Sequence, residues 1–231
     1  MDQFIVRAKS DGTDFIGTPF YRHIDQPAGR SGMGDMICEM SNLIAQSNRA
    51  TILADKAHNA LNTFCKMANG GNYIWDINPV KFRNIARQSK DWHDFQVKAN
   101  RRVLHCYPDF PYIRLNKEKF IKTDIPIGEY ATIQRVPFAK KCGYTDSIIQ
   151  SIVDRYPGMK IIDVGGKESL GLEKLAYIIN NAKFHIGIDS GMSHFANCIK
   201  DKKDVHLYVP KDKITGVTYR WINQGFNVEL I

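Results

Sequence analysis

The feature that most constrains the fold of this chain is a regular alternation of strand and helix signals in its C-terminal half. The apolar runs 160–164 (KIIDV) and 184–189 (FHIGID) each precede a segment whose apolar residues recur at helical spacing. When single helices connect successive strands, the strands pair in parallel and the crossovers are right-handed. The sequence therefore predicts an α/β protein built on parallel sheets.

The same alternation runs, less regularly, through the N-terminal half. Strands are expected at 20–24, 50–54, 73–77, 129–136, 160–164, 184–189 and 205–209, with 205–209 as the last strand. Helices are expected at about 36–46 and 58–67, within 81–98, after a cap at Thr145, at 172–179 and at 191–199. Residues 107–128 are rich in turn formers, so we place a linker there. The predicted organisation is two Rossmann-like domains, 1–125 and 126–231, facing each other across a cleft.

Composition limits the partners of the chain. It has 32 Lys and Arg residues against 24 Asp and Glu, a formal net charge of +8. That excess favours a nucleic acid, an anionic membrane surface or a phosphorylated substrate, although a solvated basic face explains it equally well. The five cysteines form no C-x-x-C pair, so neither disulfides nor a zinc site is expected. No apolar run reaches the roughly 20 residues of a membrane-spanning helix, and no secretory signal opens the chain. We expect a cytoplasmic protein, in the host's cytoplasm if a phage encodes it.

A glycine-rich loop at 29–35 (GRSGMGD) precedes the first expected helix. Its glycines allow tight turns and close approach of the backbone to a ligand. The spacing matches neither the G-x-G-x-x-G of dinucleotide-binding folds nor a P-loop, so it gives little support to a nicotinamide or ATP site. Asp35 ends the loop, where it serves either as a helix cap or as a carboxylate at the mouth of the cleft.

A second loop, 188–194 (IDSGMSH), comes where a hydrophobic strand ends and a helix begins. The backbone amides of residues 190–192, the Ser190 hydroxyl and His194 predict a cradle for a pyrophosphate, because ligands of α/β sheets bind at such junctions. The string G-I-D-S-G has Asp189 where a nucleophile elbow needs serine, which argues against an esterase. Taken alone, His194 is better explained as a partly buried structural imidazole.

These loops belong to longer stretches that carry a resemblance. The sharpest is 188–196 (IDSGMSHFA), which is similar to a D-[ST]-G-x-x-H-x-A nucleotide-sugar motif; the others are 31–35 (SGMGD), 49–54 (RATILA), 166–170 (GKESL) and 175–184. Together they resemble the heptosyltransferase-type glycosyltransferases of family 9, which have the GT-B fold. The resemblance covers about half of the chain, and the members of that family are longer.

The resemblance implies transfer of a sugar from a nucleoside-diphosphate sugar, held by the C-terminal domain, to an acceptor hydroxyl at the N-terminal domain. By position, Asp35 is the general base, and the acceptor loop consists of Arg30, Ser31, Gly32, Met33 and Gly34. The donor is held by Asp189, Ser190, Gly191, His194 and a lysine near the start of the second domain, Lys140 or Lys141. The reaction is expected to invert the anomeric centre. The chain has no D-x-D triad, so we expect neither a metal nor another cofactor.

The acceptor stays open between two classes. The family implies a lipopolysaccharide-type, phosphorylated saccharide. The basic stretches 81–102 and 211–221 slightly favour a hydroxymethylated base in phage DNA, with Trp92, Tyr219 or Trp221 available to stack on bases. Two alternatives remain: a non-catalytic nucleic-acid-binding protein on a degenerate glycosyltransferase scaffold, and an epimerase-type enzyme that consumes the donor without an acceptor. The sequence fixes neither the donor's base and sugar nor the oligomeric state.

Overall fold

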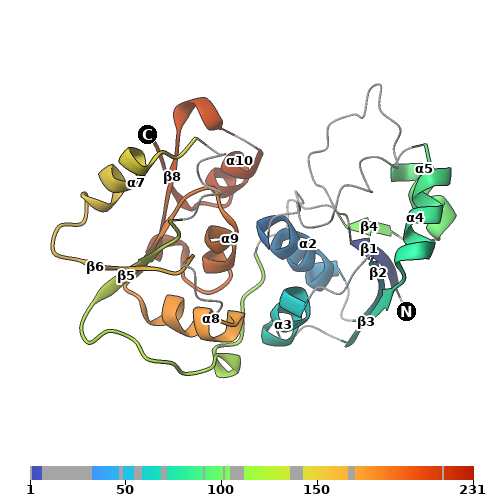
Figure 1. Ribbon diagram of the computed structural model, residues 1–231, viewed down its shortest axis with the longest axis horizontal. Helices are drawn as coiled ribbons and strands as arrows, with labels where there is room; N and C mark the ends of the chain where they lie inside the picture. The colour runs from blue at the N-terminus through green and yellow to red at the C-terminus, as the bar shows by residue number, and fades with distance from the viewer. Residues whose placement is uncertain are drawn as a thin grey trace. The chain divides into compact units, whose positions relative to one another are not determined.

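The computed structural model describes eleven stretches of the chain. They are residues 2–6, 33–46, 49–54, 59–68, 72–90, 92–100, 102–104, 112–135, 143–165, 170–214 and 216–231. These residues form two compact units, Met1–Ile113 and Arg114–Ile231, which we call the N-terminal and the C-terminal unit (Figure 1). Each is an α/β unit and is described by itself. None of the helices in the described stretches combines the length and apolar character needed to span a bilayer.

The N-terminal unit is a four-stranded parallel sheet with helices in its connections. Its strands are β1 (Asp2–Val6), β2 (Arg49–Ala54), β3 (Asn72–Ile77) and β4 (Arg102–Leu104). Its helices are α2 (Met33–Gln46), α3 (Asn59–Met67), α4 (Pro79–Gln88) and α5 (Trp92–Ala99). The strand order is β3-β2-β1-β4, so the direction in which strands are added reverses between β1 and β4.

Helix α2 supplies much of the core of the N-terminal unit. Ile37, Met40, Ser41 and Leu43 are buried, at the spacing of one helix face. The Cys65 sulfur of α3 lies 3.7 Å from the sulfur of Met40. Burial raises the pKa of Cys65 to about 12, so this thiol stays protonated and behaves as a small apolar group.

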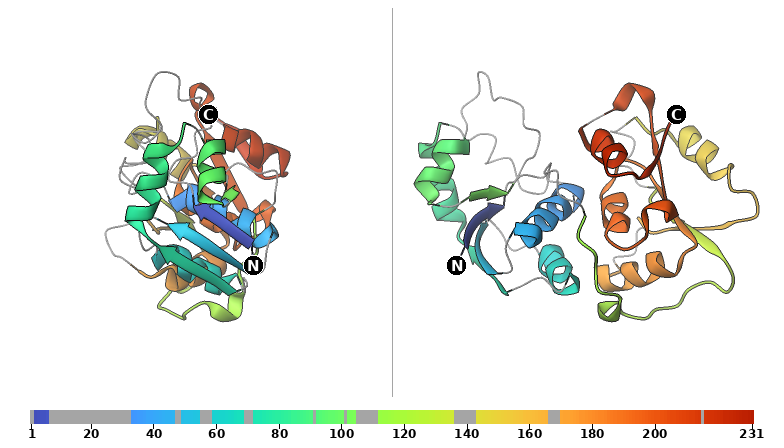
Figure 2. Two further views of the ribbon diagram at one scale, coloured as in Figure 1. Left: turned by 90° about the vertical axis from the view of Figure 1, so that its right-hand side faces the viewer. Right: turned by 180° about the vertical axis from the view of Figure 1, so that it is seen from behind.

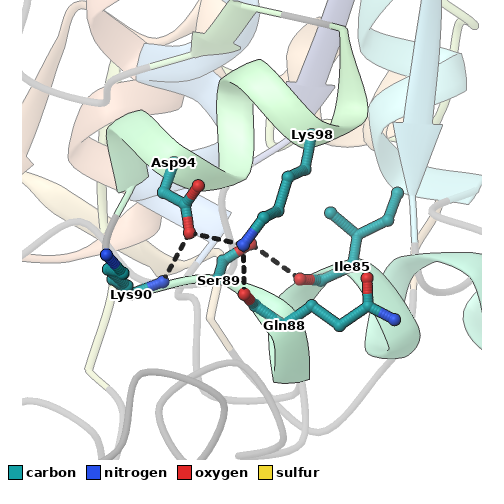
Figure 3. A network of polar contacts seen from close by, with 6 residues as sticks. All are labelled: Ile85, Gln88, Ser89, Lys90, Asp94 and Lys98. Carbon is teal, nitrogen blue, oxygen red and sulfur yellow. Dashed lines mark hydrogen bonds and ion pairs between the residues drawn. The ribbon is translucent and has the colours of Figure 1, made fainter.

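Lys98 holds the corner between α4 and α5 together (Figure 3). Its ammonium donates to the carbonyl oxygen of Gln88 at the end of α4 and lies 2.7 Å from the Asp94 carboxylate. The same carboxylate accepts the backbone amide of Lys90 at 2.9 Å. The hydrogen bond from Lys98 holds the pKa of Asp94 below its ordinary value. One cation of the basic stretch 81–102 is therefore engaged within the fold.

The C-terminal unit is a five-stranded parallel sheet of order β6-β5-β7-β8-β9. The strands are β5 (Tyr130–Ile133), β6 (Lys160–Asp163), β7 (Phe184–Gly187), β8 (Val205–Val209) and β9 (Asn227–Leu230). The helices are α7 (Asp146–Val153), α8 (Leu172–Asn181), α9 (Gly191–Asn197) and α10 (Gly216–Asn223), with the 3₁₀ turns η2 (Lys117–Lys119), η3 (Lys202–Asp204) and η4 (Lys211–Lys213). This is a doubly wound arrangement, and its switch point lies between β5 and β7.

The two faces of this sheet are covered by different helices. Helix α7 lies on one side of the sheet, and α8, α9 and α10 lie on the other (Figures 1 and 2). On the first face, Ile149 and Ile152 of α7 pack with Ile133 and Ile186. Right-handed crossovers require this division, because α7 leads from β5 outward to β6 while the later helices lead in the opposite direction.

Most expected elements are present, and Thr145 caps α7 as predicted, accepting the amide of Ile148 at 3.2 Å. Residues 205–209 were predicted to be the last strand, and this is wrong because β9 follows. Strand β9 was missed because it is a mostly exposed edge strand with one partner. Strand β1 was also missed, and the strand expected at 20–24 lies outside the described residues.

Two boundaries differ from expectation. Helix α2 begins at Met33, so Met33 to Asp35 lie in its first turn and not in a loop; the first amides of a helix need no partner within it, so Gly34 is tolerated there. The unit boundary was expected after residue 125 and falls after Ile113. The segment that follows is bonded to the C-terminal unit: Leu115 donates its amide to Cys198, and Ile121 to Glu173.

Candidate functional site

The carboxyl edge of the C-terminal sheet brings two connections together at its switch point. Strands β5 and β7 are neighbours, but the chain leaves β5 towards α7 on one face and β7 towards α9 on the other. Ligands of doubly wound sheets bind at such a place, because the diverging connections expose backbone groups at the strand ends. Here these groups belong to Gln134, directly after β5, and to residues 188–191, directly after β7.

Tyr144 fixes the loop after β7 from the side of α7. Its ring is fully buried. Its hydroxyl donates to the carbonyl oxygen of Tyr208 at 2.6 Å and accepts the amide of Asp189 at 3.0 Å. One side chain therefore ties the end of β7 to β8. This loop is held by the fold before any ligand binds, which lowers the entropy cost of binding.

Gln134 fixes the same loop from the side of β5. Its Oε1 accepts the backbone amide of Met192, in the first turn of α9, at 3.2 Å. This bond crosses the switch point directly. Gln134 is partly exposed, and it directly follows β5 at the edge of the sheet where a ligand would bind. The residue was missed in the sequence, although its place as the first polar side chain after a buried strand is a signal for it.

Close packing seats α9 on the sheet. The Ser193 hydroxyl donates to the carbonyl oxygen of Ile188 at 2.5 Å, and since its proton is used there, the Ser190 hydroxyl donates to Ser193 Oγ at 3.3 Å. A methyl group on Gly187 would lie 2.3 Å from Cδ2 of Leu207 and 2.9 Å from Ser193 Oγ. Gly187 is therefore required for this approach.

Two backbone donors remain for a ligand. Within the described stretches, the amides of Ser190 and Gly191 have no hydrogen-bond partner. Both residues are partly exposed. The sequence predicted three free amides, at 190–192, and the third is not free because Met192 donates to Gln134. The two amides form a compact pair of neutral donors, as anions prefer.

His194 lies in the interior beside this loop. It is 4% exposed, and its ring centroid lies 5.3 Å from that of Trp221. Burial, with a smaller contribution from the charge of Arg220, lowers its pKa to about 3. The imidazole is therefore neutral at pH 7 and contributes no positive charge to an anion. Its burial and its contact with Trp221 account for it as a packing residue of α9 and α10.

Stacking on a nucleic acid base was expected of Trp92, Tyr219 or Trp221. Trp221 is wholly buried, so this expectation is wrong for it: Trp221 and Thr218 form the inward face of α10. Tyr219 is 60% exposed on the same helix. Trp92 begins α5, and its side chain lies outside the described residues.

The expected acceptor-side residues are described only in part. Arg30, Ser31 and Gly32 lie outside the described residues, and so do Lys140 and Lys141. Met33, Gly34 and Asp35 are in the first turn of α2, with Gly34 buried. In the N-terminal unit, α2 leads into β2, which pairs with β1 next to the switch point of that sheet. Of Asp35, only the backbone belongs to the described part of the chain.

Among the described residues, no three His, Cys, Asp or Glu side chains are grouped so that they could hold a metal ion. Neither a protein-family model, nor a curated protein, nor a solved structure matches this chain. The class that the described residues define is therefore a doubly wound α/β unit with a pre-formed loop at its switch point.

Proposed function

We propose that the protein is a glycosyltransferase that moves a sugar from a nucleoside-diphosphate sugar to an acceptor hydroxyl, with inversion and without a metal. The observation that carries the proposal is the loop at the β5/β7 switch point, where the backbone amides of Ser190 and Gly191 have no partner among the described residues and the loop is held by Tyr144 and Gln134. The same residues supply the D-S-G of the stretch that resembles a nucleotide-sugar motif.

In this proposal the donor's diphosphate lies on the backbone amides of Ser190 and Gly191, which stabilise the charge that grows on the leaving group. The Asp189 carboxylate repels phosphate, so it accepts hydrogen bonds from hydroxyl groups of the ribose or the sugar. His194 acts through α9 as a positioning residue, because it is buried and neutral. Lys140 and Lys141 remain candidates for the diphosphate.

The transfer step assigned to Asp35 needs no metal ion. The carboxylate takes the proton of the acceptor hydroxyl while that oxygen attacks the anomeric carbon from the face opposite the diphosphate. The bond between the anomeric carbon and the phosphate oxygen breaks, and the nucleoside diphosphate leaves with its electron pair.

The acceptor we propose is a hydroxymethylated base in DNA. The support is the charge of α4, which has no acidic residue and exposes Lys81 and Arg87. Such cations bind phosphates of any sequence and thereby hold a duplex, and the target base must then leave the stack. Saccharide acceptors form the second arm of the test.

Donor binding is tested first, with a variant that removes one amide. Gly191 is the first residue of α9, where proline is favoured, and Ser190 has φ −154° and ψ 162°, as a residue before proline needs. Gly191→Pro therefore removes the backbone N–H group and preserves the helix. Gly191→Ala is the matched control, because it keeps that N–H group. The readout is a thermal shift with UDP, ADP, GDP, CDP and their sugar conjugates; ligand at about 100 times Kd adds about 2.7 kcal/mol.

We expect one nucleotide to stabilise the wild type and Gly191→Ala, and to stabilise Gly191→Pro much less. Transfer is then measured on hydroxymethylated DNA and on phosphorylated saccharides. Asp35→Asn should retain the nucleotide shift and lose at least about 100-fold in transfer rate. A shift for none of the ligands overturns the donor site, and unchanged transfer in Asp35→Asn overturns the general base. Consumption of the donor without any acceptor identifies the epimerase alternative.

A further inference from the structure

A lysine outside the resembling stretches lies at the same edge of the C-terminal sheet. Lys213 ends η4, which follows β8 directly. Strand β8 pairs in parallel with β7, so the carboxyl ends of both strands lie at one edge of the sheet, on strands that run about 4.8 Å apart. The loop with Ser190 and Gly191 and the turn with Lys213 are therefore neighbours on adjacent strands.

The stem of Lys213 is fixed by a contact with Gly143. A methyl group on Gly143 would lie 3.0 Å from Cγ and 3.1 Å from Cε of Lys213, so the chain of the lysine runs directly over the glycine. Gly143 also has φ +89°, a conformation that side chains other than glycine rarely adopt. The next residue is Tyr144, whose hydroxyl holds the amide of Asp189. The same short segment thus supports the lysine stem and the candidate ligand loop.

The ammonium of Lys213 is held less firmly than those of Lys200 and Lys202 in this unit. Lys200 is buried and donates to the carbonyl oxygen of Ala182 at 2.7 Å, and Lys202 donates to a carbonyl at the end of α10. Lys213 has the carboxylate of the adjacent Asp212 at 3.4 Å, in a pair whose side chains are 49% and 75% exposed. An exposed pair of this kind contributes little to stability. The charge of Lys213 is therefore available to a bound anion.

We propose that Lys213 binds a phosphate of the ligand held at the switch point, and that it supplies a positive charge which His194 does not. This inference rests on the proposed donor site and extends it to β8. It makes the site a diphosphate site of mixed character, with neutral donors on the β7–α9 connection and a cation on η4. Asp212 competes with the ligand for that cation.

The test uses four variants of the full chain and isothermal titration with inorganic pyrophosphate, UDP, ADP, GDP and CDP. Lys213→Gln removes the charge and should weaken binding of the nucleotide by about tenfold, while Lys213→Arg should bind within about twofold of the wild type. Lys211→Gln is the matched control, since Lys211 is exposed in the same 3₁₀ turn. The contact with Gly143 is made by Lys213. Asp212→Asn should bind more tightly, because it removes the competing carboxylate.

The outcomes separate this inference from the proposed function. If Gly191→Pro loses nucleotide binding and Lys213→Gln binds as the wild type does, the donor site stands and the role of Lys213 is overturned. Equal losses in Lys211→Gln and Lys213→Gln also overturn it, because they show a general effect of surface charge. If the wild type binds none of the five probes, both proposals fail. The substitutions of Lys211, Asp212 and Lys213 are at exposed positions, and the melting temperature of each variant checks that it folds.

Discussion

The backbone amide of Met192 donates to Oε1 of Gln134 at 3.2 Å, and this bond joins the end of β5 to the first turn of α9 across the switch point. The bond therefore links the end of β5, from which the chain continues to α7 on one face of the sheet, to α9 on the other face. Gln134 is partly exposed at the edge of the sheet where a ligand would bind.

Substitution of Gln134 separates its structural role from its place beside the ligand. Gln134→Ala removes the acceptor and should lower the free energy of unfolding by about 1 kcal/mol. Gln134→Glu keeps an acceptor for the Met192 amide, so stability should stay near that of the wild type. Its added negative charge should weaken nucleoside diphosphate binding by about tenfold or more. Urea unfolding and titration calorimetry measure the two effects. Equal nucleotide affinity in Gln134→Glu and wild type would place the ligand elsewhere.

Tyr144 offers a second test of the brace. Tyr144→Phe leaves the ring in place and removes the hydroxyl that joins Asp189 to Tyr208. Because the ring is fully buried, the Tyr208 carbonyl loses a partner that water replaces poorly, and the free energy of unfolding should fall by about 1–3 kcal/mol. Tyr219→Phe is the control, since this hydroxyl is on a ring that is 60% exposed. Chemical denaturation measures the free energy of unfolding of both variants. If Tyr144→Phe is as stable as Tyr219→Phe, the two hydrogen bonds of the Tyr144 hydroxyl do not stabilise the fold.

The C-terminal fold is largely predictable from sequence because its central strands β5, β7 and β8 are buried and its helices have clear ends. The run KIIDV and the cap at Thr145 are local signals, and each fixes an element without knowledge of the partner strand. Strand β9 lacks such a signal: Asn227 and Glu229 face solvent, and pairing with β8 is what makes it a strand. Local residue patterns do not predict long-range pairing of this kind.

The candidate site shows the same limit. The loop 188–194 was identified from its composition and its place after a strand, and its unoccupied amides at Ser190 and Gly191 agree with that expectation. The bond from Met192 to Gln134 spans a sequence separation of 58 residues and depends on strand order. The burial of His194 and Trp221 follows from the packing of α9 on α10, and a basic, aromatic stretch of sequence does not reveal which of its rings face inward.

Gly187 should tolerate no side chain. The methyl group of Gly187→Ala would lie 2.3 Å from Cδ2 of Leu207, and the overpacking should cost about 1–3 kcal/mol of unfolding free energy or more. Leu207→Ala removes the clashing atom, so the double variant should be less destabilised than the sum of the two single variants. Denaturation of all four proteins gives this coupling. Strictly additive effects would mean that the clash with Leu207 is relieved by a shift of the backbone.

Stability should fall as the pH drops below about 6.5, because two buried imidazoles must stay neutral in the folded chain. Burial lowers the pKa of His185 and of His194 to about 3, against about 6.5 when unfolded. Between these values the unfolded state binds more protons, so each imidazole removes about 1.4 kcal/mol of unfolding free energy per pH unit as the pH falls. Above 6.5 both states are neutral and this contribution to the pH dependence vanishes.

His185 allows that assignment to be checked, since it lies fully buried in β7 with Nδ1 2.9 Å from Thr132 Oγ1 and no partner for Nε2 within the described residues. In His185→Leu the loss of stability between pH 6.5 and 5 should be shallower by about 1.4 kcal/mol per pH unit. Urea midpoints across this range, where most carboxylates remain ionised, measure the slope. An unchanged slope in His185→Leu would mean that this imidazole takes up protons in the folded chain as it does in the unfolded chain, and that its burial and the charge of Lys200 do not prevent this.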